Sequence, residues 1–134
     1  MDGMFEVKNI SVSIHRSPQD VYAFVSNGEY LPRWATGLGN KIRRVGGEWL
    51  AEGPLGNVKV RLADPNELGV ADQDVILEAG VTVHNPIRVV PNGTGSTVIF
   101  TLMRLPGVSE QKFAADSKWV ERDLTTLKTL LEQP

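Results

Sequence analysis

The chain has 134 residues, of which 41% are hydrophobic and 22% charged, and its formal net charge is -2. This composition predicts one soluble globular domain, residues 1–134, and the weak negative charge argues against nucleic-acid binding. The absence of cysteine excludes disulfides, thiol nucleophiles and thiolate metal sites. No secretory signal precedes the first strand, and no apolar run reaches the ~18 residues of a membrane span, so we expect a cytoplasmic protein without membrane contacts.

The first elements are predicted to be a strand and two short helices. Residues 5–16 alternate between apolar and polar side chains, with a change of phase that predicts a bulge at residues 8–9. Ser-Pro-Gln-Asp at 17–20 has the capping serine and the first-turn proline of a helix start. Asn-Gly at 27–28 is expected to end this helix in a left-handed cap, and residues 30–34 predict a second helical turn.

From residue 41 onward the pattern changes to short strands separated by turn residues. About six strands are expected, over residues 41–45, 49–52, 58–62, 69–78, 81–90 and 96–105. Pro86 lies inside the fifth of these and must disturb its ladder, because proline has no backbone N–H to donate. The glycine-rich segment at 91–95 predicts a hairpin between the last two strands.

The last element is predicted to be a long amphipathic helix over residues 109–132. Ser109 is the expected N-cap, and large apolar side chains recur at steps of three and four on one face: Phe113, Val120, Leu124, Leu127 and Leu131. The helix needs a sheet on which to bury this face. The sequence therefore predicts an α+β fold in which a curved antiparallel sheet of about six or seven strands wraps around the C-terminal helix.

Four segments resemble one superfamily. They are Ser-x-x-Asp at 17–20, Tyr-Leu-Pro-Arg-Trp-Ala at 30–35, the segment from Pro86 to Ser96, and the Asp-x-x-x-Val-x-x-Asp-Leu-x-x-Leu-Lys helix from Asp116. Together with the element order they are similar to the SRPBCC superfamily, which includes START-like lipid-binding domains, and most of all to its small polyketide cyclase/dehydrase-like branch. This resemblance implies the helix-grip fold, with a ligand cavity between the sheet and the long helix.

The histidines, two in number, provide little support for catalysis. No His-Glu-x-x-His pair is present, so neither a metal nor another cofactor is expected. His15 is interpreted as a solvent-exposed residue at the end of a strand. His84 is either an edge-strand residue facing water or a general base facing the cavity. Arg88 is either a surface charge or an inward guanidinium that binds a ligand carboxylate or enolate.

Polar residues interrupt the apolar strand at 69–78. By alternation Asp72 and Asp74 share one face, and Gln73 shares the other with Ala71 and Val75. If that second face is the inner one, Gln73 is a polar group in an apolar wall. Its amide can orient a ligand but cannot transfer protons near neutral pH.

Large apolar side chains are the other candidates for a pocket. An apolar ring with a polar tip suits a hydrophobic or aromatic ligand, although plain core packing is the alternative for each residue. The predicted wall residues are Tyr30, Trp34, Trp49, Met103 and Phe113. Trp119 lies off the main helical stripe and is expected at the pocket rim or at a contact between subunits.

Three functions follow from these observations. The first is binding of a small hydrophobic molecule in the cavity, with Gln73, His84 and Arg88 as polar contacts. The second is a cyclase/dehydrase-like enzyme in which His84 is the base and Arg88 stabilises an oxyanion. The third, which the resemblance to co-chaperone-like domains also implies, is a protein-interaction module, in its simplest form a homodimer.

Overall fold

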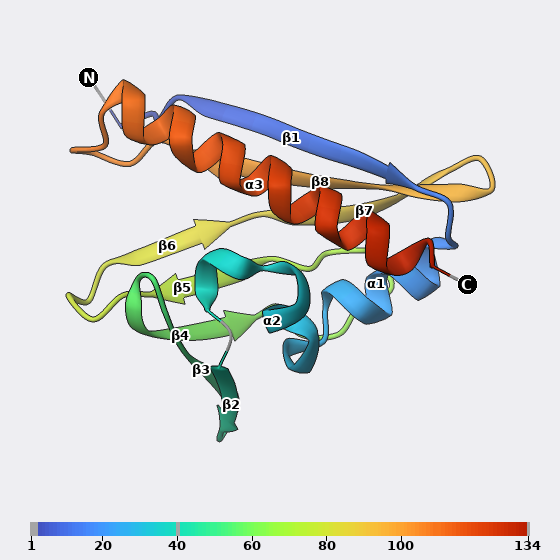
Figure 1. Ribbon diagram of the computed structural model, residues 1–134, viewed down its shortest axis with the longest axis horizontal. Coiled ribbons are helices and arrows are strands. Elements are labelled where there is room, and N and C mark those ends of the chain that lie inside the picture. The colour runs from blue at the N-terminus through green and yellow to red at the C-terminus, as the bar shows by residue number, and fades with distance from the viewer. Residues whose placement is uncertain (1–2, 40, 134) are drawn as a thin grey trace.

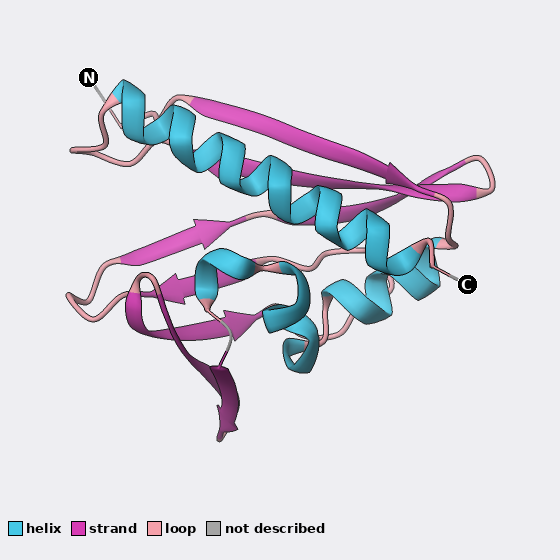
Figure 2. Cartoon of the chain, in the orientation of Figure 1, coloured by secondary structure: helices cyan, strands magenta, loops and turns pink. Residues whose placement is uncertain are grey.

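The computed structural model describes residues 3–39 and 41–133 and has the α+β architecture expected from the sequence (Figures 1 and 2). Its helices are α1 (Pro18–Val25), α2 (Leu31–Trp34) and α3 (Glu110–Leu131), with short 3-10 turns η1 (Gly28–Tyr30) and η2 (Thr36–Leu38). Its strands are β1 (Val7–Ile14), β2 (Lys41–Val45), β3 (Glu48–Gly53), β4 (Gly56–Leu62), β5 (Gln73–Ile76), β6 (Thr82–Asn85), β7 (Ile87–Asn92) and β8 (Gly95–Met103).

The strands form two antiparallel sheets that share a broken strand. One sheet has the order β1-β8-β7 and the other β2-β3-β4-β5-β6, and only Pro86 separates β6 from β7. A bridge between Val70 and Arg88 also joins the sheets, next to hydrogen bonds from Ala71 and Val89. The predicted disturbance by proline is confirmed, because the backbone leaves one sheet and enters the other at this residue.

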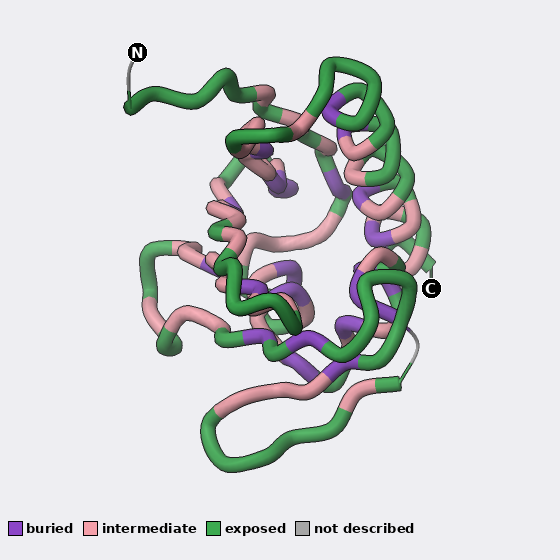
Figure 3. The backbone as a smooth tube through the Cα atoms, turned by 90° about the vertical axis from the view of Figure 1, so that its left-hand side faces the viewer, coloured by how far each residue is buried: buried purple, intermediate pink, exposed green. Residues whose placement is uncertain are grey.

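Helix α3 covers β1 and β8 and also contacts α2 (Figure 1). The Ser109 side chain accepts a hydrogen bond from the Lys112 N–H and so caps the first turn, as predicted. Phe113, Leu124, Leu127 and Leu131 are buried, and Figure 3 shows that the buried positions of this helix face the sheet. The predicted helix-grip arrangement is therefore confirmed: the sheet curves around one long C-terminal helix.

Three local predictions are wrong. β1 has no bulge, since its register with β8 is continuous from Val7 to Ile14, and the apparent phase change arises because Val7 lies on the outer face. Gly28 does not form a left-handed cap; Asn27 instead accepts a hydrogen bond from the Glu29 N–H and caps η1. The strand expected over 69–78 is regular only in β5, because its first residues form the bridge to β7.

Ser17 and Pro18 begin α1 as predicted, and the Ser17 side chain accepts from the Asp20 N–H. The core continues from this helical corner to α3 and contains Val21, Leu31 and Leu127, all of which are fully buried. None of the helices over residues 3–39 and 41–133 is long and apolar enough to cross a membrane.

Candidate functional site

Strand alternation separates an inner face, toward α3 and the short helices, from an outer face. In β5 the inner side chains are Gln73 and Val75, which are 3% exposed each. Asp74 lies between them and points outward, opposite His84 of β6. The face of each predicted site residue therefore follows from its position in the register.

Among the residues that the structure describes, two buried side-chain N–H groups on the inner side have no hydrogen-bond partner. They are the Nε2 amide of Gln73 and the Nε1 of Trp34, whose residues are 3% and 2% exposed. A buried donor without a partner is destabilising by about 1–3 kcal/mol, so native proteins rarely keep one unless a water or a ligand satisfies it. These two donors are the strongest structural indication of a binding site.

The start of α3 carries a second buried patch, apart from the core cluster that contains Trp34 and Val75. Phe113 is buried, and the Lys8 ammonium lies 4.9 Å from the centre of its ring. One turn later the buried stripe contains Ser117 instead of a large apolar residue. A small side chain here leaves more room under the helix than leucine would. Inner-facing Val83, Phe100 and Val120 are only partly buried, so this side of the core is accessible.

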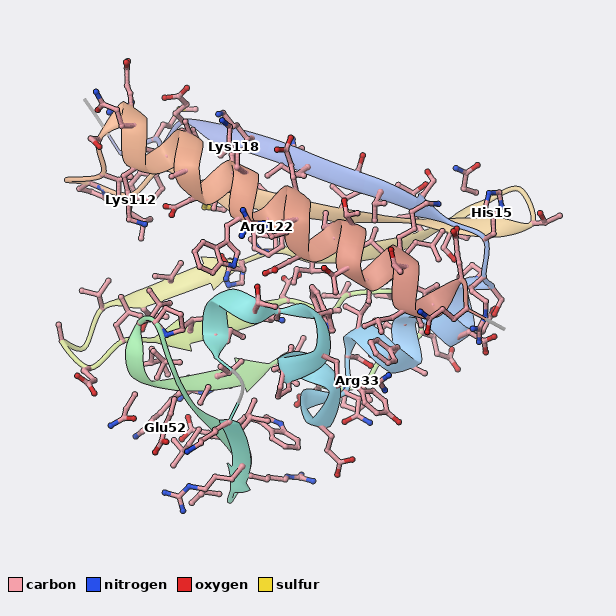
Figure 4. The ribbon with its side chains drawn as sticks, viewed as in Figure 1. His15, Arg33, Glu52, Lys112, Lys118 and Arg122 are labelled. Carbon is pink, nitrogen blue, oxygen red and sulfur yellow. The ribbon has the colours of Figure 1, made fainter. Side chains whose placement is uncertain are left out.

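A hydrogen-bonded chain joins α3 to η2 at the edge of this region. The Trp119 Nε1 donates to Thr36 Oγ1 at 3.1 Å, and the Thr36 hydroxyl donates to Asp123 Oδ1 at 2.7 Å. Desolvation by burial raises the pKa of Asp123, against the hydrogen bonds from Thr36 that lower it. We call Trp119, Thr36 and Asp123 the latch. The Arg122 guanidinium lies over the Trp119 ring, on the side of α3 that faces the short helices (Figure 4).

Three of the five predicted wall residues are only partly buried. Tyr30 stacks on Phe24 in the helical corner, with ring centres 4.5 Å apart, and Arg33 lies beside both rings (Figure 4). The Trp49 ring lies directly against Gly28. Met103 pairs with Val7, so it belongs to the outer face and is not part of an inner wall. Of the five predicted walls, only Trp34 and Phe113 are buried on the inner side.

His84 and Arg88 belong to a charged cluster on the outer face. The His84 Nδ1 lies 2.6 Å from Asp74, and its Nε2 lies 3.7 Å from Asp72. Asp72 also pairs with Arg88 and accepts a hydrogen bond from the Ile87 N–H. The sequence did not decide which way His84 and Arg88 point. The structure turns both away from α3, and half of the His84 side chain is exposed. An acid–base pair inside the cavity therefore has no support from this geometry.

The outer face of the five-stranded sheet carries a broad hollow of about 640 Å³. Its borders include three basic side chains, Lys41, Arg43 and Lys59, together with Leu50 and the acidic Glu52 (labelled in Figure 4). The hollow is open to solvent, and its charges are mixed. Among the described residues, no group of three or more histidine, aspartate or glutamate side chains is arranged to bind a metal ion.

Sequence reasoning missed Lys8, Ser117 and two of the three latch residues, Thr36 and Asp123, whereas it did single out Trp119. Lys8 shares the parity of Ile10 and Val12, so alternation alone places it on the inner face once the false bulge is removed. Ser117 follows Phe113 by four residues and thus belongs to the same helical stripe. The contact between Thr36 and Asp123 joins residues 87 positions apart, and no local pattern predicts it.

Comparisons with known proteins identify the fold but no family. No family model matches the chain, and no curated protein matches it. Solved structures do match over nearly the whole length. The Aha1 dimer from Colwellia psychrerythraea has a TM-score of 0.72 at 17% identity, covering 95% of this chain and 96% of that one. XoxI from Bacillus cereus has a TM-score of 0.73 at 16% identity, covering 93% and 94%.

An uncharacterised protein from Bacillus thuringiensis is similar to the same degree, with a TM-score of 0.75 at 15% identity over 96% of this chain and 100% of that one. At such identities the likeness extends to the fold alone. One of these neighbours is a dimer, and their shared architecture is the helix-grip-like α+β fold of this chain.

Proposed function

We propose that the protein binds a small, largely apolar molecule between the sheet and α3, and that this molecule carries a hydrogen-bond acceptor. The observation that carries the proposal is the pair of buried donors, Gln73 Nε2 and Trp34 Nε1. Both are N–H groups, so each requires an oxygen or another lone pair. A carbonyl, carboxylate or ether oxygen on an apolar body meets this requirement.

The surroundings of the donors support an apolar body. Buried Val60, Val75 and Leu124 belong to the same core as Trp34, and Phe113, outside that cluster, is buried at the start of α3 together with Ser117. Burial of apolar ligand surface contributes about 25 cal/mol per Å² removed from water. The polar contacts then fix orientation, as in most small-molecule sites. The resemblance to the SRPBCC superfamily, in which such ligands occupy the same space, supports the same proposal.

We further propose that the latch controls entry. Thr36 and Trp119 hold η2 against α3 through side-chain hydrogen bonds that are exposed to water. Exposed hydrogen bonds of this kind contribute only about 0.5–1.5 kcal/mol each, so they open and close readily. The Trp119→Phe variant removes the donor to Thr36 and is expected to speed both binding and release.

The test is native mass spectrometry of the protein purified from its own host, compared with the mass after denaturation. A discrete adduct that is lost on unfolding is the expected result. In parallel, 1-anilinonaphthalene-8-sulfonate serves as a probe with an aromatic body and acceptor oxygens. The Trp34→Phe variant keeps an apolar ring but loses the N–H, and we expect it to bind the probe about tenfold more weakly, or 1.4 kcal/mol.

The Trp49→Phe variant is the matched control, because it makes the same exchange at a tryptophan whose ring lies against Gly28 and whose N–H is not one of the two unpartnered donors. It should bind the probe as the original protein does. Circular dichroism of each variant establishes that the fold is intact. A bare mass together with equal probe binding by the Trp34 and Trp49 variants would contradict the proposal.

A further inference from the structure

β1 is an edge strand. It pairs with β8 along its whole length, and no other strand in the described part of the chain pairs with its opposite side. Figure 1 shows it at the rim of the molecule, beside α3. The His15 N–H donates to Glu132, and the Ser13 carbonyl accepts from Lys128, so the backbone groups of odd-numbered residues face this rim. Asn9 and Ser11 therefore present their N–H and C=O groups outward from the sheet.

The middle of this edge lacks the features that normally prevent strand pairing. Natural edge strands carry proline, bulges or outward charges. β1 has no proline and no bulge, and its outer-face side chains at positions 9, 11 and 13 are asparagine and serine. Lys128 and Glu132 cover only its last residues. Beside the uncovered part lies a hollow of about 410 Å³, lined by residues 9–12 of β1 and by Glu121, Leu124 and Thr125 of α3.

The outer stripe of α3 above this edge, in which Lys128 is partly buried and pairs with Glu132 of the same chain at 2.7 Å, has a charge order that is complementary to itself. Its residues are Lys118, Glu121, Thr125, Lys128 and Glu132, spaced by three and four. If the same helix of a second chain runs in the opposite direction, centred on Thr125, each lysine lies opposite a glutamate. Lys118 is then opposite Glu132, and Glu121 is opposite Lys128. Figure 4 shows Lys118 on the β1 side of α3 and Arg122 on the other side. Thr125 and Ser11 line the same hollow, so the midpoint of the α3 stripe lies next to the midpoint of the free edge of β1.

We infer that this edge binds a second copy of the chain about a two-fold axis, with β1 antiparallel to β1 of the partner and α3 antiparallel to α3 of the partner. An antiparallel pair centred on Ser11 exchanges backbone hydrogen bonds between the two serines, and between Asn9 and the partner's Ser13, whose carbonyl accepts from Asn9 with the lone pair that Lys128 does not use. The sheet becomes continuous across the axis, and both helices lie on one face. A two-fold arrangement requires each patch to be complementary to itself, which this patch is.

The interface lies on the β1 side of α3, whereas Gln73 and the latch lie on the side of the five-stranded sheet and short helices. Dimer formation thus leaves the proposed ligand site open. The two proposals are independent, and either is testable without the other.

Multi-angle light scattering after size exclusion, over about 1 to 500 μM protein, is the first test. We expect the mass to rise from one chain to two. Because ion pairs between the helices are exposed, the dimer should dissociate more readily as NaCl increases from about 50 to 500 mM. Hydrogen exchange should slow with concentration at the Asn9 and Ser11 amides. The Val12 amide belongs to the ladder with β8 and should not change.

The Ser11→Pro variant removes an N–H that faces the rim and leaves the ladder to β8 intact, so we expect dimer affinity to fall at least about tenfold. Glu121→Lys places a lysine opposite Lys128 of the partner subunit and should have a similar effect. Glu29→Lys, at an exposed position in η1, makes the same change in net charge and is the matched control. A monomer at every concentration would overturn the inference. So would a dimer that neither Ser11→Pro nor Glu121→Lys weakens.

Discussion

Replacing Gln73 with leucine tests how much the unpartnered Gln73 amide destabilises the ligand-free protein, as expected if its partner is a bound ligand. The amide nitrogen of Gln73 is buried without a partner, whereas leucine has nearly the same volume and no polar atoms. Removing a buried, unsatisfied N–H gains back a desolvation penalty of about 1–3 kcal/mol. We therefore expect the ligand-free Gln73→Leu protein to be more stable by about 1 kcal/mol or more. For a chain of this size that is a rise in Tm of roughly 3–5 °C.

The assay is urea unfolding of ligand-free protein, followed by circular dichroism, with the slope compared between variants. An unchanged slope shows that the midpoint reports stability alone. Gln111→Leu, an exposed position on α3, is the control for the side-chain exchange and should leave the midpoint nearly unchanged. Binding of the anilinonaphthalene probe should weaken about tenfold in the Gln73 variant only. A Gln73→Leu protein that is less stable by 1 kcal/mol or more would refute the reasoning, since the amide would then be satisfied in the folded state.

Three further predictions concern pH and packing. Burial raises the pKa of Asp123 above its usual 3.8, so the folded state holds this proton more tightly than the unfolded state, and stability falls as pH rises from 3.8 through the folded pKa. Asp123→Asn should reduce that fall, as measured by the urea midpoint from pH 3.5 to 7. The hydrogen bond from Lys128 lowers the pKa of Glu132 below 4.5, so its contribution is present above pH 4.5 and is lost as pH falls through the folded value. Glu132→Gln should remove this loss on acid titration. In Gly28→Ala the new Cβ would lie 2.2 Å from Trp49 Cε2, which should destabilise the protein by about 1–3 kcal/mol and shift the tryptophan fluorescence.

Each of these has an outcome that would contradict it. Parallel stability curves for Asp123→Asn and the original protein would mean that burial of the carboxyl has no energetic effect. For Glu132, the same acid-induced loss in the glutamine variant would assign that loss to other carboxylates. Gly47→Ala is the control for Gly28, because nothing lies within 4 Å of the added Cβ there, and an equal loss in both variants would exclude the ring contact.

The elements with strong local signals could be predicted from the sequence. The α3 stripe and the Ser17 and Ser109 caps depend on neighbours within one or two helical turns, and all three occur as expected. Pro86 divides its strand because the missing N–H is a property of the residue itself. The predicted bulge in β1 is wrong, because the alternation pattern counts every apolar residue as buried, whereas almost half of Val7 is exposed.

The candidate site was less predictable, because it depends on which face of each strand meets the helices. Alternation assigns Asp72 and Gln73 to opposite faces but does not say which face is inside. The outward direction of His84 follows from its pairing with Asp74 on the neighbouring strand. The burial of Trp34 Nε1 and the contact from Thr36 to Asp123 depend on how the short helices dock, which no spacing in the chain records.

The pairing of β1 with β8 determines when the protein can fold during synthesis. β1 leaves the ribosome first among the strands, yet its partner strand begins at Gly95 and its covering helix at Glu110. At about 5–20 residues per second, the nascent β1 remains without both for roughly 5 to 20 s. Its final contacts, such as Ser13 with Lys128, span 115 residues. Folding of this domain is therefore a late event, and an emerging chain must keep an unpaired, β-prone segment away from its neighbours on the same messenger RNA until α3 is complete.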